Sequence, residues 1–280
     1  MNNLPKAEAG DFVGRFREII SDPINNLIRR HPRAGYVEND LVCLHNGLMV
    51  PVSGPYAYYG DFSAILVVNR GVHEPLEEFV FQELLKRLPE SPRMLELGAY
   101  WGHYSMWLMQ SRPSASVYLV EPETANILAG KNNFQLNGFA GTFLQAFVGR
   151  NDFIVDQYIE QQGITTLDIL HGDIQGFEIE MLEGAQSLLA RKAVNYIFVS
   201  THSQSLHETT VLMLRDAGYR VEVSSDFESG TTSYDGLVFA SSYAVPALFE
   251  NFSPLSRVDI LGAGPPELIE FMTQAIHAHE

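Results

Sequence analysis

A glycine-spaced turn is the strongest local signal for ligand binding in this sequence. Gly98 and Gly102 follow the apolar run Arg93 to Leu97 and precede a segment with helical spacing. A strand that ends in glycines and opens a helix lets a ligand approach the backbone closely and offers it free N–H groups. Because a tight turn without a ligand gives the same pattern, the turn alone is weak support for a site.

A carboxylate at the end of the next predicted strand strengthens that signal. Glu121 follows the run Val117 to Val120 and lies roughly twenty residues after the glycine turn. A carboxylate in this position can accept hydrogen bonds from both hydroxyls of an adenosine ribose. A solvated acid at a strand end is common, but the turn and the acid together predict a nucleoside-containing cofactor.

The charge beside the turn separates two classes of cofactor. Dinucleotide-binding folds typically carry G-x-G-x-x-G, with a pyrophosphate at the helix N-terminus. Here the spacing is Gly98-x-x-x-Gly102, and the acid Glu96 precedes it. S-adenosylmethionine carries a sulfonium and an ammonium group and no phosphate, so the charge favours it. The residues expected around it are Glu96, Gly98, Ala99, Tyr100, Gly102 and Glu121.

Two later strand ends supply candidate catalytic groups. His171 and Asp173 end the predicted strand that begins at Leu167, and the period of two places them on the same side. His202 ends the next strand, so adjacent strands would bring it beside Asp173. An acid and a histidine can position and deprotonate an acceptor hydroxyl. They are also ligand types for a divalent metal ion, although no spacing in the sequence demands one.

Strand and helix signals alternate from residue 74 onward. This alternation predicts a doubly wound α/β fold, with a mostly parallel sheet, helices on both faces and ligands at the carboxyl ends of the strands. The helices are expected near residues 76–88, 103–109, 124–136, 177–189, 206–217 and 266–277. The strands are expected at 93–97, 117–120, 142–148, 167–171, 196–199, 219–223 and 237–240.

The sequence predicts an N-terminal α+β extension at residues 1–71 ahead of a main domain at 72–280. Short helices are expected before residue 36, followed by hairpins, with Ala64 to Val68 as a buried strand. The aromatic cluster Tyr56 to Phe62 could cover the site as a lid, but hairpin packing is the more common role of such a cluster. The polar loop Ser224 to Asp235 could reach a substrate or stay solvated. Its candidate contacts are Asp226, Glu228, Thr231, Thr232 and Tyr234.

Composition excludes several classes of protein. The chain has 280 residues, 46% of them hydrophobic, which is enough for a large core. A net charge of −16 counts against binding to nucleic acid or to an anionic membrane surface. A single cysteine, Cys43, excludes an intrachain disulfide and a cysteine-built zinc site. With no signal-peptide pattern and no long apolar run, a cytoplasmic protein is expected.

Several segments together resemble the FkbM-type family of class I S-adenosylmethionine-dependent methyltransferases. The run Leu95 to Gly102 looks like motif I of class I methyltransferases, and Asp173 to Glu178 is similar to the family's Asp-Val-Glu-Gly-x-Glu signature. The resemblance covers about residues 72–241. The other matching segments are Glu74-Pro75, Val120-Glu121-Pro122, Lys131 to Gly138 and Leu182 to Ala185.

The sequence departs from the family pattern near the expected active face. Tyr100-Trp101 replaces a small Asn-Ile pair, Gln175 replaces Glu, and His171 replaces Lys. These changes concern the lining of the cofactor pocket and the substrate side. The resemblance implies a seven-stranded sheet of the class I methyltransferase type with its last strand antiparallel.

The function predicted from these observations is methyl transfer to a hydroxyl of a small molecule, such as a sugar or a natural-product scaffold. Asp173, His202 and His171 are the candidate catalytic residues. A nucleotide-linked oxidoreductase and a non-catalytic cofactor-binding or partner module are the alternatives. A protein or RNA methyltransferase is a weaker one. Homodimerisation is compatible with the sequence, which does not demonstrate it.

Overall fold

A mixed β-sheet forms the centre of the protein. The computed structural model describes residues 12–149 and 152–277. Its main sheet has seven strands in the order β6-β5-β4-β7-β8-β10-β9. Their bounds are β4 Arg93–Leu97, β5 Ser116–Val120, β6 Thr142–Leu144, β7 Leu167–Gly172, β8 Val194–Thr201, β9 Tyr219–Ser225 and β10 Gly236–Ser242.

The pairing directions explain the edge at which the candidate residues meet. The strands from β6 to β8 pair in parallel, whereas β10 runs antiparallel to both β8 and β9. The start of β10 therefore lies at the edge where β4, β7 and β8 end. The expected class I methyltransferase type of sheet, with its last strand antiparallel, is confirmed.

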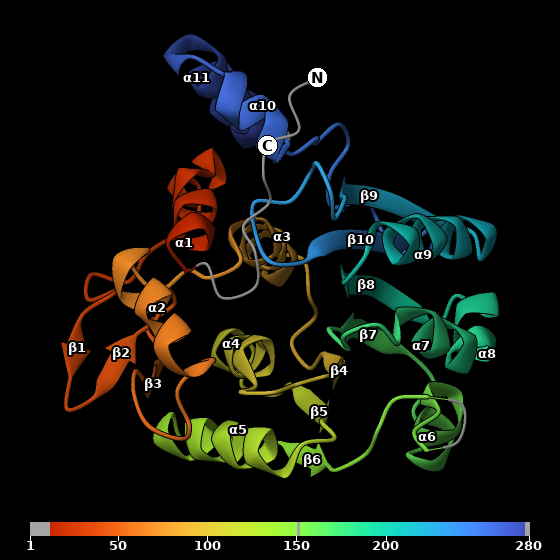
Figure 1. Ribbon diagram of the computed structural model, residues 1–280. Helices are drawn as coiled ribbons and strands as arrows, with labels where there is room; N and C mark the ends of the chain where they lie inside the picture. Colours follow the sequence, from red (N-terminus) through yellow and green to blue (C-terminus); the bar gives the residue numbers. More distant parts are fainter. Residues whose placement is uncertain (1–11, 150–151, 278–280) are drawn as a thin grey trace.

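Helices cover both faces of this sheet, as Figure 1 shows. One face carries α3 Pro75–Leu85, α4 His103–Ser111 and α5 Thr124–Leu136. The other carries α6 Val155–Gln161, α7 Glu178–Gly184, α8 Gln186–Ala190 and α9 Gln204–Asp216. Because side chains alternate along a strand, Met94 packs into the first apolar core and Leu95 into the second.

The N-terminal segment packs beside α3 and α4. It contains α1 Phe12–Ser21, the 3₁₀ helix η1 Pro23–Asn26, the strands β1 Val37–Glu38, β2 Leu41–Cys43 and β3 Met49–Pro51, the 3₁₀ helix η2 Gly60–Ser63 and α2 Ala64–Val68. The three strands form a separate antiparallel sheet. Ile19 and Leu44 share one apolar core with Phe79 and Phe81 of α3. The division at residue 71 stays a prediction.

The expectation of a buried strand at Ala64–Val68 is wrong, because this segment is the helix α2. Periodicity cannot separate a strand from a helical turn in so short an apolar run. The preceding 3₁₀ turn Gly60–Ser63 leads directly into the helix, and Ser63 itself has helical backbone angles. Ile65 and Leu66 are buried, whereas Val67 and Val68 are partly exposed.

Other boundaries differ from the expectations in smaller ways. The helix expected over 177–189 is interrupted at Ala185 and forms α7 and α8. The strand expected to reach Val148 stops at Leu144, and Val148 makes an isolated bridge to Phe153. The C-terminal part contains α10 Arg257–Gly262, which was not predicted from the sequence. It also contains α11 Pro265–His277, which agrees with the expected last helix.

No helix within residues 12–149 and 152–277 has both the length and the apolar character needed to cross a membrane.

Candidate functional site

The glycine turn after β4 packs directly against the loop after β7. Gly98 has a φ of +72°, and a Cβ on it would lie 1.7 Å from the backbone oxygen of Asp173. Only a residue without a side chain allows this approach. The glycine of the predicted cofactor turn thus brings that turn against the candidate catalytic residue.

Three of the six residues predicted around the cofactor lie behind the cavity surface. Glu96 is buried and accepts hydrogen bonds from the backbone N–H and the hydroxyl of Ser105. Burial raises the pKa of Glu96 to about 7. Ala99 is also buried. Gly102 has a φ of +73°, and a Cβ on it would collide with the ring of Phe134. These groups shape the turn from within.

Gly98, Tyr100 and Glu121 line a cavity of about 260 Å³ at the ends of β4, β5 and β7. The remaining lining residues are Tyr59, Pro122, Glu123, Asn126, Phe147, Val148, Asp173, Ile174, Gln175 and Phe177. The Glu121 carboxylate accepts hydrogen bonds from the N–H of Tyr100, the N–H of Glu123 and the amide of Asn126. These contacts fix its orientation at the end of β5.

Tyr100, one of the departures from the family pattern, connects this cavity to the N-terminal segment. Its φ of +41° is unusual for a residue with a side chain. Its hydroxyl accepts a hydrogen bond from the N–H of Tyr59 and donates one to the carbonyl of Ala57. Trp101 instead turns inward, where it is buried and stacks on His103. The two replacements therefore act on opposite sides of the turn.

Two phenylalanines of this cavity were not singled out from the sequence. Phe147 and Phe177 pack edge to face with ring centroids 4.5 Å apart, and both remain partly exposed. Exposed aromatic rings at a cavity wall form an apolar surface for a flat ring. Phe147 follows the third strand and Phe177 lies in the Asp173 to Glu178 segment, so the strand-end rule already marked both neighbourhoods.

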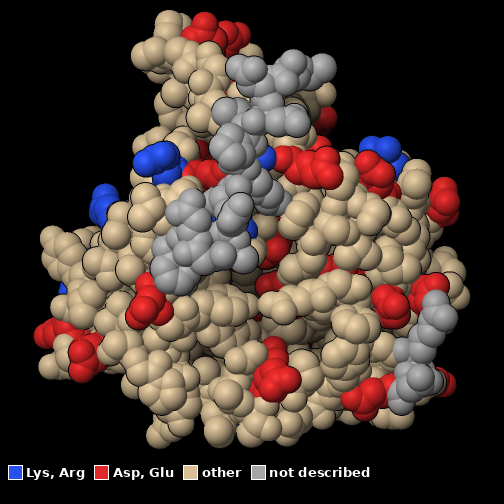
Figure 2. Space-filling model, viewed as in Figure 1, with Lys and Arg blue, Asp and Glu red and all other residues tan. Residues whose placement is uncertain are grey.

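A second cavity of about 450 Å³ adjoins the first. Its lining residues are Tyr58, Tyr59, Phe62, Glu74, Asp173, Gln175, His202, Phe227, Tyr234 and Asp235. The two cavities share Tyr59, Asp173 and Gln175. Figure 2 shows acidic side chains around the hollow in the middle of this face. The aromatic cluster of the N-terminal segment thus contributes Tyr58, Tyr59 and Phe62 to the cavity, whereas Tyr56 and Asp61 do not line it.

Three residues of the polar loop before β10 line the larger cavity: Phe227, Tyr234 and Asp235. The other candidates have different partners. Asp226 accepts hydrogen bonds from the N–H groups of Ser229 and Gly230 in its own turn. Thr232 donates a hydrogen bond to Asp22.

Asp173 and His202 do meet, as the adjacent strands predicted, and Asp235 joins them. The Nε2 atom of His202 lies 3.2 Å from Oδ1 of Asp173 and 3.4 Å from Oδ1 of Asp235. On its other side, Nδ1 of His202 contacts Oε1 of the buried Glu178 at 2.5 Å. We call Asp173, His202 and Asp235 the acidic trio.

The protonation of the trio follows from these contacts. Burial lowers the pKa of His202, but hydrogen bonds to Asp173 and Glu178 and the charge of Asp235 raise it to about 11. Burial raises the pKa of Asp235 to about 8, against the opposing effect of His202. His202 is therefore a charged donor at neutral pH, Asp235 keeps its own proton there, and Asp173 is the member of the trio left to accept a proton.

Asp235 and Glu178 join the site through contacts that the sequence analysis did not use. Gly236 pairs with Thr201 across the antiparallel strands, which places Asp235 beside His202. The start of an antiparallel strand lies at the same edge as the ends of its parallel neighbours. Glu178 ends the signature segment that begins at Asp173, and its side chain is fully buried and holds His202.

The structure encloses His171, the third candidate catalytic residue. It is 3% exposed, lines neither cavity, and its Nε2 lies 2.6 Å from Oε1 of Glu77. Burial lowers its pKa, but the hydrogen bond and charge of Glu77 raise it to about 9. Glu77 also accepts a hydrogen bond from Ser200. His171 thus forms a buried ion pair between α3 and the sheet.

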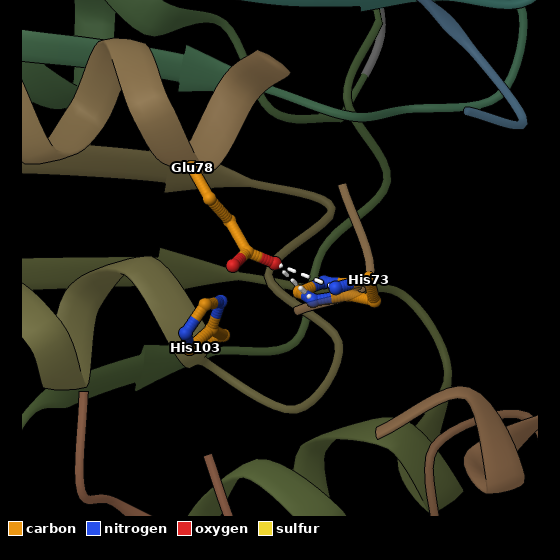
Figure 3. Close-up of side chains that lie close together, drawn as sticks. All are labelled: His73, Glu78 and His103. Atoms are coloured by element: carbon orange, nitrogen blue, oxygen red, sulfur yellow. Dashed lines mark hydrogen bonds and ion pairs between the residues drawn. The ribbon is translucent and has the colours of Figure 1, made fainter. Parts of the chain in front are cut away.

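A second buried cluster of ionisable groups lies behind the glycine turn, as Figure 3 shows. His73 contacts Oε1 of Glu78 through Nδ1 at 2.6 Å, and His45 lies 2.9 Å from Oε2. The ring of His103 lies next to the rings of His73 and His45. All four side chains are at most 3% exposed. Charge from His45 and His73 holds the pKa of Glu78 well below its usual range despite burial.

Part of this edge of the sheet is similar to a known protein family. A model of the methyltransferase FkbM domain matches residues 151–221, which include Asp173, Glu178 and His202. No curated protein sequence matches the chain significantly.

Several solved methyltransferase structures are similar to the chain. A precorrin-6y C5,15-methyltransferase from Geobacter metallireducens GS-15 has 15% identity over 58% of this chain and 84% of its own, with a TM-score of 0.44. TrmK of M. capricolum, solved with S-adenosyl-homocysteine, has 12% identity over 71% and 83%, with a TM-score of 0.42. A SAM-dependent methyltransferase from Aquifex aeolicus has 16% identity over 57% and 88%, with a TM-score of 0.40.

The family match falls on the strands and loops that carry Asp173, Glu178 and His202, whereas Asp235 lies outside the matched residues. The resemblance expected from the sequence is thereby confirmed: residues 151–221 match the model of the methyltransferase FkbM domain, and the sheet is of the class I methyltransferase type.

Proposed function

We propose that the protein is an S-adenosylmethionine-dependent methyltransferase that methylates a hydroxyl of a small molecule, such as a sugar or a natural-product scaffold. The observation that carries this proposal is the junction of the two cavities at Tyr59, Asp173 and Gln175. One cavity offers nucleoside-binding groups and the other offers proton acceptors. A donor and an acceptor bound in them would meet at this junction.

The smaller cavity fits the cofactor by the chemistry of its lining. Glu121 presents a carboxylate at the end of β5, where a ribose diol would donate hydrogen bonds to it. Phe147 and Phe177 provide an apolar wall for a base. When bound, S-adenosylmethionine supplies a methyl group on a positively charged sulfur. Gly98, Tyr100 and Glu121 are the residues that would bind the cofactor.

The larger cavity suits an acceptor that has both apolar and polar surface. Tyr58, Phe62 and Phe227 supply aromatic walls, and the trio supplies polar groups at the junction. Alignment of the reacting atoms is itself a large part of the catalytic effect. The walls would therefore orient the acceptor, with its hydroxyl toward Asp173.

The trio divides two tasks among its members. The charged His202 donates a hydrogen bond that orients the acceptor oxygen, and Glu178 holds the imidazole in place. The hydroxyl proton passes to the carboxylate of Asp173, because His202 already carries its second proton and Asp235 also holds a proton at neutral pH. The hypothesis that Asp173 and His202 act together is kept, with the histidine as donor.

Calorimetric titration of the purified protein with S-adenosylhomocysteine tests the cofactor. We expect saturable one-to-one binding that Glu121→Ala weakens at least about tenfold. Glu160→Ala, an exposed acid on α6, is the matched control and should bind like the unmodified protein. No binding by the unmodified protein would overturn the methyltransferase proposal.

A second experiment tests the acceptor side. The double variant Asp173→Ala, His202→Ala should keep S-adenosylhomocysteine binding and lose turnover on a library of hydroxyl compounds. Full turnover of the double variant on an acceptor of the unmodified protein would contradict the role of the trio.

A further inference from the structure

The spacing of the acidic trio matches that of ligands sharing one metal ion. Nitrogen and oxygen ligands lie about 2.1 Å from a divalent metal ion, so two ligands at angles of 90–110° are about 3.0–3.4 Å apart. The distances from Nε2 of His202 to Asp173 and Asp235 are 3.2 and 3.4 Å. One ligand atom from each of the three residues lies within 4.8 Å of a ligand atom from each of the other two.

The group behind the histidine supports the same interpretation. Ligating histidines commonly donate their second ring N–H to a carboxylate, which fixes the ring and its tautomer. Glu178 takes this position, with Oε1 2.5 Å from Nδ1 of His202 and a fully buried side chain. Its Oε2 atom is buried without a hydrogen-bond partner among the described residues. A buried unpaired oxygen calls for a cation or a water molecule.

The charge around this point is also that of a cation site. Glu74 joins Asp173 and Asp235 in the cavity lining, and none of the described lining residues is a Lys or Arg. His202 is the one basic side chain in that lining. A mixed set of two carboxylates and one imidazole leaves coordination positions open toward the cavity, which suits a transition-series divalent ion.

We propose that Asp173, His202 and Asp235 bind a divalent cation of the Mn²⁺ type, with Glu178 as the positioning residue for His202. The role of the ion deepens the proposed function. Its open positions would hold an acceptor with two adjacent oxygen atoms, such as a vicinal diol, and its charge would favour loss of the hydroxyl proton. The ion would replace the Nε2 proton of His202, Asp173 and Asp235 would serve as carboxylate ligands, and the hydroxyl proton would leave to solvent.

The buried cluster in Figure 3 is the rival cation site, and its geometry differs. There Nδ1 of His73 lies only 2.6 Å from Glu78, which is the spacing of a direct charged hydrogen bond. His73, Glu78 and His103 are also enclosed, with no face on the two cavities of the site. The distances thus assign the ion to the trio.

Titration with Mn²⁺, followed by electron paramagnetic resonance of the free ion, tests this assignment on the full chain. We expect one Mn²⁺ per chain with a Kd below about 100 μM. Asp173→Asn and Asp235→Asn should each weaken binding more than about tenfold, and Glu178→Gln should weaken it about 10- to 100-fold. Glu228→Gln, an acid of the same loop that lies outside the trio, should bind like the unmodified protein.

Two results would overturn the proposal. The first is no saturable Mn²⁺ binding by the unmodified protein up to about 1 mM. The second is unchanged binding in both Asn variants, which would place the ion elsewhere, with the cluster around Glu78 as the first candidate. Calorimetry with S-adenosylhomocysteine on the same samples separates the two proposals, because cofactor binding without Mn²⁺ binding rejects only the metal ion.

Discussion

At the scale of single residues, the same side-chain type serves different purposes according to its surroundings. Glu121 lies at a cavity wall with hydrogen bonds that fix its orientation, whereas Glu96, also near the turn, is enclosed and bonded to Ser105. His202 reaches the cavity and His171 does not. Burial and partners decide which acids and histidines are available to a ligand.

Glu96 provides a test of burial at this scale. Its pKa of about 7 in the folded state exceeds its ordinary value of 4.5 because burial disfavours the charged form. The unfolded chain therefore loses the proton first, and the contribution of Glu96 to stability falls as pH rises from about 4.5 to 7. Across that window the loss amounts to about 3 kcal/mol.

Glu96→Gln should remove that loss. Relative to the unmodified protein, the free energy of unfolding of the variant should rise between pH 4.5 and pH 8, as measured by urea denaturation. A constant difference between the two proteins across this range would contradict the assignment.

A second prediction concerns His202. Because His202 orients and does not accept the proton, His202→Gln should retain part of the turnover, whereas Asp173→Ala, His202→Ala should retain none. Turnover numbers with saturating acceptor, together with unchanged S-adenosylhomocysteine affinity, would check this. Equal loss in both variants would show that the histidine charge itself is required.

At the scale of elements, turns rather than helices decide where the site forms. The glycine turn after β4 and the loop after β7 touch at Gly98, and the start of β10 brings Asp235 to the same edge. These contacts join segments that are far apart in the sequence, and each depends on a backbone that comes very close to its neighbour.

Gly98→Ala tests this contact. The added Cβ would meet the oxygen of Asp173 at 1.7 Å, and the φ of +72° adds strain, so the loop after β7 must move. We expect a large loss of stability, about 3 kcal/mol or more, and loss of S-adenosylhomocysteine binding.

The matched control for this change is Gly138→Ala. Its φ is +74°, but no atom lies within 4 Å of the added Cβ. It should cost only the backbone strain of about 1 kcal/mol and keep cofactor binding. Thermal unfolding and calorimetry of both variants measure the difference, and similar losses in the two would show that strain, not the contact, dominates.

At the scale of the whole molecule, the N-terminal segment forms part of the acceptor cavity. Tyr58, Tyr59 and Phe62 line it, and α1 contacts the loop before β10 (Figure 1). Arg15 of α1 lies 3.1 Å from the centre of the Tyr234 ring and donates a hydrogen bond to the carbonyl of Ser233. The segment therefore holds the loop that carries Asp235.

Arg15→Ala should loosen that loop. We expect a loss of about 2 kcal/mol in the free energy of unfolding and a higher KM for the acceptor, because the cation–π contact and the hydrogen bond of the buried Arg15 disappear. Arg17→Ala on the exposed side of α1 should change neither quantity measurably. Chemical denaturation and steady-state kinetics check both, and an unchanged KM in Arg15→Ala would separate α1 from the acceptor site.

The sequence by itself determined the sheet, the glycine turn and the meeting of Asp173 with His202. These rest on local signals: short apolar runs bounded by turns, and the rule that parallel strands end at one edge. The strand at Arg93–Leu97 and the helix at Thr124–Leu136 agree with their expected bounds. The five-residue run Ala64–Val68 failed because its length does not distinguish a helix from a strand.

Only the tertiary structure decided which polar groups face the cavities. Glu121 and His202 reach the cavities, whereas Glu96 and His171 do not. Packing against α3, α4 and the N-terminal segment decides this. The addition of Asp235 and Glu178 to the site depends on long-range contacts between β7, β8 and β10. Periodicity describes one element at a time, whereas burial and charge partners arise where several elements meet.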